Sequence, residues 1–291
     1  MNTIVFKPSN YYVSLSVTGT YCELKCPFCK GRYLAGMINV SNPKFLLKIL
    51  DYHYKHGARG FLISGGFNRD GYLMIRNEHL KVIKDFKKDH NVIFSIHPGL
   101  IPDVLLELIW SSEVDFIDLE IPPNNKYLRM IKRLKSHTIN EYFKLMDKAL
   151  TYSKNFVVPH VILNSIASGI DDELSVIETI ANFRPRLLVT LIEMRDRMSN
   201  YIDVDRVIKV LRKAKKLFNE VSLGCMRPYE FKTKYDEIII KEELVSRIVN
   251  PKPTIIKRFN LKVIGACCGI DKSHFKLFEE GLKKCRSMKG K

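Results

Sequence analysis

Short runs of Val, Ile, Leu and Phe recur at regular intervals along this sequence, and longer amphipathic segments separate them. The short runs predict buried strands, and the amphipathic segments predict the helices that cover them. The expected strands are residues 13–17, 60–64, 91–96, 114–120, 156–163, 186–192, 221–224 and 261–265. The expected helices are residues 42–56, 77–89, 102–112, 138–154, 171–183, 204–218, 235–249 and 271–287.

This alternation of strand and helix is typical of an α/β fold with a parallel sheet. Strand–helix units repeated through one chain of 291 residues predict a (β/α)8 TIM-type barrel. A doubly wound open sheet is the alternative. No stretch rich in Gly, Pro or Ser divides the chain, so residues 1–291 are expected to form a single domain.

The chain is strongly basic, with 48 Lys and Arg residues against 31 Asp and Glu residues and a formal net charge of +17. This charge favours an acidic partner, either nucleic acid or an acidic protein, unless it reflects only a lysine-rich composition. One amphipathic basic segment, residues 126–135, follows the strand at 114–120. We expect a lid, a docking surface or an ordinary solvated helix there. Its basic residues are Lys126, Arg129, Lys132, Arg133 and Lys135.

The sequence predicts a cytoplasmic protein that does not cross a membrane. Its longest apolar run, near residues 156–163, is far shorter than the roughly 18 apolar residues of a membrane-spanning helix. The first residues lack the charged-then-apolar order of a secretion signal. Seven unevenly spaced cysteines in such a chain indicate metal ligands before disulfides.

Cys22, Cys26 and Cys29 form a C-x3-C-x2-C run directly after the first expected strand. Cysteines spaced this closely in a loop are typical of iron–sulfur ligands. Three thiolates on a [4Fe–4S] cluster leave one iron open to a substrate or cofactor. Zinc is the alternative, but a structural zinc site needs a fourth ligand, and the nearest candidates are His53 and His56 in the next expected helix.

The run C-x3-C-x-aromatic-C, with Phe28 as the aromatic residue, resembles the signature of the radical S-adenosylmethionine (SAM) enzymes. The resemblance implies that loop 18–37 holds the cluster and that the open iron binds SAM. One electron from the reduced cluster then cleaves SAM to methionine and a 5′-deoxyadenosyl radical, which abstracts hydrogen from an unactivated carbon. Gly65, Gly66 and Phe67 resemble the family's glycine-rich motif that holds the amino group of SAM, with Phe67 where an acidic residue is more usual.

Further polar residues fall where strands of a barrel end, at the edge that carries active sites. These residues are Asp118, Glu120, His160 and Arg195. By position we expect them to bind SAM or to orient the substrate, with rim salt bridges and helix caps as the alternative.

A second group of cysteines follows the last two expected strands. Cys225 ends one of these strands, and Cys267 and Cys268 end the other. In a closed barrel they would lie beside the first cluster, so we infer a second iron–sulfur cluster, for which Arg227, a serine or the substrate could supply a fourth ligand. Small apolar core residues are the alternative. Cys285, near the end of the last expected helix, is placed too far away to be a ligand.

A second cluster beside the first suggests sulfur insertion, as in the biotin synthase-like members of the family. Residues 16–37 resemble more closely one component of the two-protein lipoyl synthase of archaea and some bacteria. That resemblance implies an octanoyl-lysine on an acidic carrier protein as substrate, a second radical SAM subunit and a reductant protein as partners. The alternatives are a biotin synthase-like enzyme acting on a small molecule or RNA, and a non-catalytic module that binds metal and nucleic acid.

Overall fold

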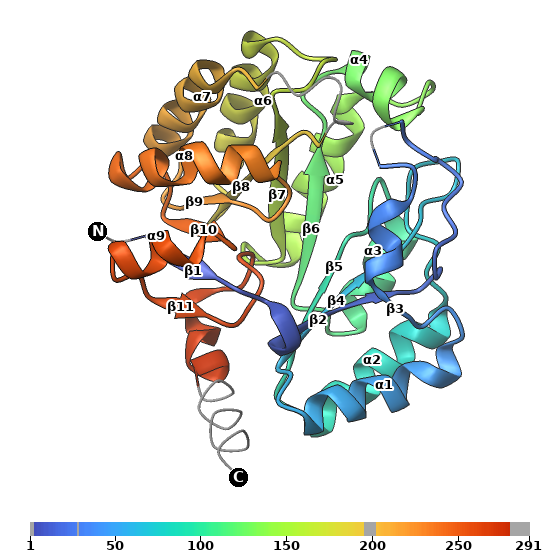
Figure 1. Ribbon diagram of the computed structural model, residues 1–291. Coiled ribbons are helices and arrows are strands. Elements are labelled where there is room, and N and C mark those ends of the chain that lie inside the picture. Colours follow the sequence, from blue (N-terminus) through green and yellow to red (C-terminus); the bar gives the residue numbers. More distant parts are fainter. Residues whose placement is uncertain (1–2, 28, 195–201, 280–291) are drawn as a thin grey trace.

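The computed structural model describes residues 3–27, 29–194 and 202–279 (Figure 1). The predictions for Phe28, Arg195 and Cys285, and for the last helix beyond residue 279, fall outside these residues. No helix within the described ranges is long and apolar enough to cross a membrane.

A parallel sheet of 11 strands curls around an inner core, in the order β11-β1-β10-β9-β8-β7-β6-β5-β4-β2-β3 (Figure 1). From β4 to β10 each strand is added beside the last in one direction, which excludes the doubly wound alternative. The strands are β1 (Ile4–Phe6), β2 (Tyr12–Ser16), β3 (Ile38–Asn39), β4 (Gly60–Ser64), β5 (Ile93–Ile96), β6 (Phe116–Ile121), β7 (Val157–Leu163), β8 (Leu188–Ile192), β9 (Val221–Leu223), β10 (Arg247–Val249) and β11 (Val263–Ile264).

Helices cover the outer face of this sheet (Figure 1). Local sequence sets where they begin: the Asn42 side chain accepts a hydrogen bond from the Lys44 N–H, and Thr138 and Glu141 form a capping box. The helices are α1 (Pro43–Lys55), α2 (Asn77–Asp89), α3 (Asp103–Ser111), α4 (Asn125–Tyr127), α5 (Ile139–Tyr152), α6 (Ile170–Asn182), α7 (Val204–Leu217), α8 (Tyr229–Lys241) and α9 (Pro253–Arg258), with a π-helical turn, η3 (Leu128–Lys132), directly after α4.

The predicted strands and helices between residues 13 and 218 are confirmed, and the prediction fails near the C-terminus. The helix expected at 235–249 is wrong at both ends, because α8 begins at Tyr229 and ends at Lys241, and β10 follows it. Arg247 opens β10 and is only 2% exposed, so a charged residue marks a buried strand. Three strands were not predicted at all: β1, β3 and β10.

The expected closed barrel of eight strands is therefore corrected to a curled sheet whose two ends are not paired by strand hydrogen bonds in the described residues. Strand β11 lies beyond β10 and β1 from β9, so the last two predicted strands are not neighbours. A C-terminal strap, residues 266–278, instead bridges the gap with side chains. Phe275 packs on Phe6 of β1 with ring centroids 5.8 Å apart, and Phe278 packs on Tyr12 of β2 at 5.9 Å.

The strap is fixed inside the curl by two arginines at the amino ends of the strands, the buried Arg247 and the half-buried Arg186. Arg247 donates to the carbonyl oxygens of Cys268 and Ile270, at 2.6 Å each. Arg186 donates to the carbonyl oxygens of Gly269 and Ile270. These bonds place the last described cysteines in the interior of the sheet.

Candidate functional site

The cysteine loop leaves the carboxyl end of β2, at the edge of the sheet where the sequence placed it. Its chain turns tightly, because Lys30 N–H donates to the Cys26 carbonyl oxygen at 2.8 Å and Lys25, Lys30 and Gly31 have positive φ angles. The turn brings the Cys26 and Cys29 thiols into hydrogen-bond contact. That bond from Cys26 lowers the pKa of Cys29 to about 6 against the opposing effect of burial, and it raises the pKa of Cys26, as burial also does.

Cys22, the first cysteine of the run, lies against a different partner. Its Sγ accepts a hydrogen bond from the Phe67 N–H at 3.4 Å and lies 3.8 Å from the Phe67 carbonyl oxygen. Over the described ranges, no group of three His, Cys, Asp or Glu side chains is arranged to hold a metal ion. The structure thus brings together the thiols of Cys26 and Cys29. The third predicted ligand, Cys22, instead contacts the backbone of the neighbouring loop at Phe67.

The Gly65–Gly66 pair supports the cysteine loop directly. A Cβ atom on Gly66 would lie 1.8 Å from the Tyr21 carbonyl oxygen and 2.6 Å from the Cys22 Cα, so no side chain fits there. The Gly66 N–H donates to Thr18 Oγ1 at 2.6 Å. The glycine that the family resemblance assigned to SAM is therefore required by the loop itself, and its N–H is already bonded.

Glu120 and Lys132 form a buried ion pair near the two contacting thiols. Lys132 Nζ lies 2.6 Å from Glu120 Oε1, with side chains that are 11% and 30% exposed. Burial alone would lower the pKa of Lys132, but the Glu120 carboxylate and the Cys26 thiol raise it above the ordinary value. The prediction that Lys132 belongs to an exposed docking surface is wrong.

Six buried side-chain polar atoms lack a hydrogen-bond partner among the described residues, and two of them concern this site. They are Asp118 Oδ1, on a side chain only 1% exposed, and the hydroxyl of Tyr127, a residue with no exposed surface. Burial, followed by the Glu120 and Glu193 carboxylates, raises the pKa of Tyr127, so the phenol is neutral. Buried polar groups are normally bonded, so atoms of this kind indicate a place where a ligand or ordered water binds.

Asp118 stands between two histidines. Its carboxylate oxygens lie 3.6 Å from His97 Nε2 and 3.7 Å from His160 Nε2. His160 Nδ1 lies 2.9 Å from the Val158 carbonyl oxygen, which can only accept, so that nitrogen carries a proton. Desolvation lowers the pKa of His97, and Asp118 opposes this shift. The arrangement is a polar group able to hold or move a proton inside the curl.

The second group of cysteines is brought together in part. Cys267 and Cys268 are hydrogen-bonded to each other, which lowers the pKa of Cys268 to about 7 and raises that of Cys267. Cys268 is buried in the inner hydrophobic cluster, as the alternative of a core residue predicted. Cys225 is exposed on the loop after β9. A metal-binding arrangement of these three cysteines is not present.

Arg227 is excluded as a fourth ligand for a second cluster. Its guanidinium is fully buried and binds the Asp236 carboxylate through two hydrogen bonds, of 3.0 and 2.7 Å. It also donates to the Gly224 carbonyl oxygen. These charge-assisted hydrogen bonds of the guanidinium fix the loop that carries Cys225.

Two further carboxylates are buried and hydrogen-bonded. Glu173 is bonded by Arg206, by the Asn164 N–H at 2.6 Å and by Ser168. Glu193 accepts from the Ser165 hydroxyl at 2.7 Å. The sequence analysis missed Glu173, because it lies in a stretch that resembles an ordinary helix start and no spacing in the sequence distinguishes it.

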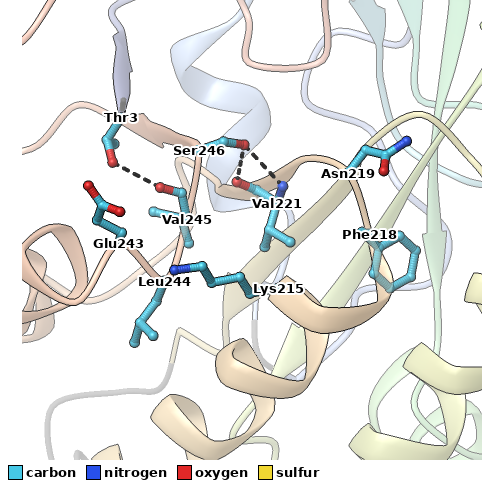
Figure 2. Close-up of a pocket in the computed structure, with 9 residues that line it drawn as sticks. All are labelled: Thr3, Lys215, Phe218, Asn219, Val221, Glu243, Leu244, Val245 and Ser246. Carbon is cyan, nitrogen blue, oxygen red and sulfur yellow. Dashed lines mark hydrogen bonds between the residues drawn. The ribbon is translucent and has the colours of Figure 1, made fainter. Parts of the chain in front are cut away.

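Two cavities lie away from the cysteine loop. One, of about 250 Å³, lies at the amino ends of β1, β9 and β10, where Ser246 exchanges hydrogen bonds with Val221 (Figure 2). The other, of about 490 Å³, lies outside the sheet against α3 and α5. The first is at the opposite edge of the sheet from the cysteine loop, and no residue of that loop lines the second, so neither cavity forms part of the candidate site.

No known protein family matches this sequence, and no curated protein matches it. Solved structures do match. Methylornithine synthase (PylB) is 13% identical over 94% of this chain and 86% of its own, with a TM-score of 0.58. HydG, a maturase of the [FeFe]-hydrogenase, is 15% identical over 85% of this chain and 57% of its own, with a TM-score of 0.55.

The HMG-CoA lyase of Brucella melitensis also matches, with 11% identity over 98% of this chain and 99% of its own and a TM-score of 0.54. At these identities the matches show a shared TIM-barrel-like fold. Because enzymes of different chemistry share that fold, the function has to be argued from the site.

Proposed function

We propose that this protein is a radical SAM enzyme whose Cys22, Cys26 and Cys29 hold a [4Fe–4S] cluster. The observation that carries the proposal is the C-x3-C-x2-C loop at the carboxyl end of β2, with two of its thiols already in contact. Methylornithine synthase and HydG, which share the fold, are radical SAM enzymes. The lyases share it as well, so the loop carries the argument.

The residues present fit such a cluster in their chemistry. Three thiols are the donors that iron–sulfur clusters use, and those of Cys26 and Cys29 are already in contact. Cys22 would have to turn from the Phe67 backbone to join Cys26 and Cys29. Its two contacts to the Phe67 backbone, at 3.4 and 3.8 Å, are long hydrogen bonds to sulfur, which a bond from sulfur to metal can replace.

The residues of the mouth fit a polar ligand such as SAM. When bound, the cluster would supply the single electron that cleaves SAM. Asp118 Oδ1 and the Tyr127 hydroxyl are unpartnered within the described part of the chain and are suited to bind hydroxyl or amino groups. The apolar side chains of the inner cluster exclude water from the same interior.

We further propose that the reaction is sulfur insertion into an unactivated C–H bond, with an octanoyl chain on a carrier protein as substrate. The resemblance of residues 16–37 to the lipoyl synthase component supports this. So does the contacting thiol pair Cys267–Cys268 in the interior, which offers two sulfur donors for a second cluster. Cys225 would complete three ligands, after a movement of the loop that Arg227 anchors.

The proposal is tested by anaerobic reconstitution with iron and sulfide, followed by SAM, a reductant and an octanoylated carrier. We expect about eight irons per chain for two clusters, together with 5′-deoxyadenosine and a sulfur-containing product. About four irons with 5′-deoxyadenosine but no product would leave radical SAM chemistry and exclude sulfur insertion. Bound zinc with no 5′-deoxyadenosine would overturn the enzyme assignment in favour of a metal-binding module.

The carrier would bind the exposed basic residues after β6. Lys126, Arg129, Arg133 and Lys135 are all exposed there, and Met130 is 49% exposed among them. A basic surface with one apolar side chain suits an acidic carrier.

Reversing the charges of Arg129 and Arg133 to Glu is expected to weaken carrier binding by roughly tenfold at low salt, and by less as salt screens the charges. The matched control reverses Lys215 and Lys216, which are exposed near the far end of α7. Titration calorimetry at two salt concentrations measures both variants. Equal affinities for the two would place the carrier elsewhere.

A further inference from the structure

Lys132 is a buried lysine at the end of a π-helical turn. The turn, Leu128–Lys132, ends where Arg133 adopts a left-handed conformation, with φ of 61°. Single π-helical turns are rare and occur frequently at functional sites. Here the turn directs Lys132 inward while Arg129 and Arg133 stay exposed. Placing an ammonium group in the interior is costly, so its position needs an explanation beyond solubility.

The surroundings of Lys132 are the cysteine loop and Glu120. The carboxylate lies 2.6 Å away and keeps the lysine charged. The charges of Lys132 and Glu120 both reach Cys26 and Cys29. Tyr127 and Tyr142 are the other titratable groups close by, and burial raises the pKa of each, so both are neutral. Lys132 is therefore the one positive charge among the groups named here that face the thiol pair.

We infer that Lys132 is a positioning residue for the cluster: its ammonium group, held by Glu120, stabilises the negative charge at Cys26 and Cys29 and raises the reduction potential of the cluster bound there. The inference rests on the proposed function, since it requires that these cysteines hold a cluster. Reduction adds one negative charge to a cluster that is already anionic with three thiolates. A buried cation nearby favours the more negative state, and water screens it less than it would an exposed charge.

Glu120 has the opposite effect on the same charge, which makes a graded set of variants available. Removing the cation in Lys132→Met should lower the potential, and removing the anion in Glu120→Gln should raise it. In the double variant Lys132→Met/Glu120→Gln, the potential should lie between those of the two single variants, because two opposing charges are removed together. The double variant also leaves no unpaired buried charge, so it tests the inference in a protein that folds.

The experiment is an EPR-monitored redox titration of the reconstituted cluster before SAM is added. We expect the potential to be highest in Glu120→Gln and lowest in Lys132→Met, with wild type and the double variant between them and Lys132→Arg near wild type. The matched control, Arg129→Gln, removes an exposed charge from the same turn and should leave the potential unchanged.

Equal potentials in wild type and Lys132→Met, with the cluster intact in both, would overturn the inference and leave the proposed function standing. A shift in Arg129→Gln as large as that in Lys132→Met would also overturn it, because the effect would then come from overall charge. If no cluster forms in the wild-type protein, the proposed function itself fails. The amount of reconstituted iron distinguishes these results.

Discussion

Replacing Cys26 with serine is expected to abolish the SAM-cleaving cluster and to reduce 5′-deoxyadenosine formation to background. Cys26 is only 5% exposed and its thiol bonds that of Cys29, so it lies at the centre of the ligand set. A cluster that loses one of three thiolates loses the fixed geometry that leaves a single iron open. Serine keeps the size of the side chain and so preserves the packing of the loop.

The control for this change is Cys225→Ser, on the loop after β9. Cys225 is exposed and belongs to the second group of cysteines. We expect this variant to keep SAM cleavage while it loses sulfur-containing product and about half of the bound iron. Iron content, the EPR signal with and without SAM, and 5′-deoxyadenosine are measured for both. Normal SAM cleavage in Cys26→Ser would contradict the assignment of the loop.

Local patterns predicted most of the fold because each local preference agreed with the final structure. The Asn42 cap before Pro43 begins α1 where expected, and the run Gly60–Ser64 is β4 with the predicted bounds. In such segments, burial on one side and solvent on the other produce the periodicity that is read from the sequence.

The closure of the sheet could not be predicted, because it depends on contacts between distant residues. The buried Arg247 donates to two carbonyl oxygens of the C-terminal strap. Because the two segments are distant in sequence, no local pattern predicts this contact. Strands of two or three residues, such as β3 and β11, are too short to show a period. Aromatic packing of Phe275 and Phe278 then replaces the strand pairing that a barrel would predict.

The residues of the candidate site likewise divide into those that local sequence predicts and those that depend on contacts between distant segments. Spacing was sufficient to single out Cys22, Cys26 and Cys29, since ligands in one loop are local in sequence. It was insufficient for Lys132, which a charge pattern assigns to the surface and a π-helical turn directs inward. Likewise the Gly–Gly pair is recognised by sequence, but its reason, contact with the Cys22 backbone, comes from the meeting of two loops.

Replacing Gly66 with alanine is expected to displace the cysteine loop and to lower iron binding severely. The added Cβ would lie 1.8 Å from the Tyr21 carbonyl oxygen, and a backbone atom cannot move aside as a flexible side chain can. Overpacking of this kind typically costs about 1–3 kcal/mol of the free energy of unfolding. Phe67, the residue that follows Gly66, donates a hydrogen bond to Cys22 Sγ, so the strain at Gly66 acts directly on a predicted cluster ligand.

Gly36→Ala is the matched control for this substitution. Gly36 lies in the same cysteine loop, but a Cβ atom there would meet nothing within 4 Å. We expect this variant to bind iron as the wild type does and to unfold within about 1 kcal/mol of it. Urea unfolding of the apoproteins and iron content after reconstitution are compared for both. If Gly66→Ala and Gly36→Ala retain equal iron, the loop is not held by its contact with Gly66, and the ligand set must be organised by the cluster alone.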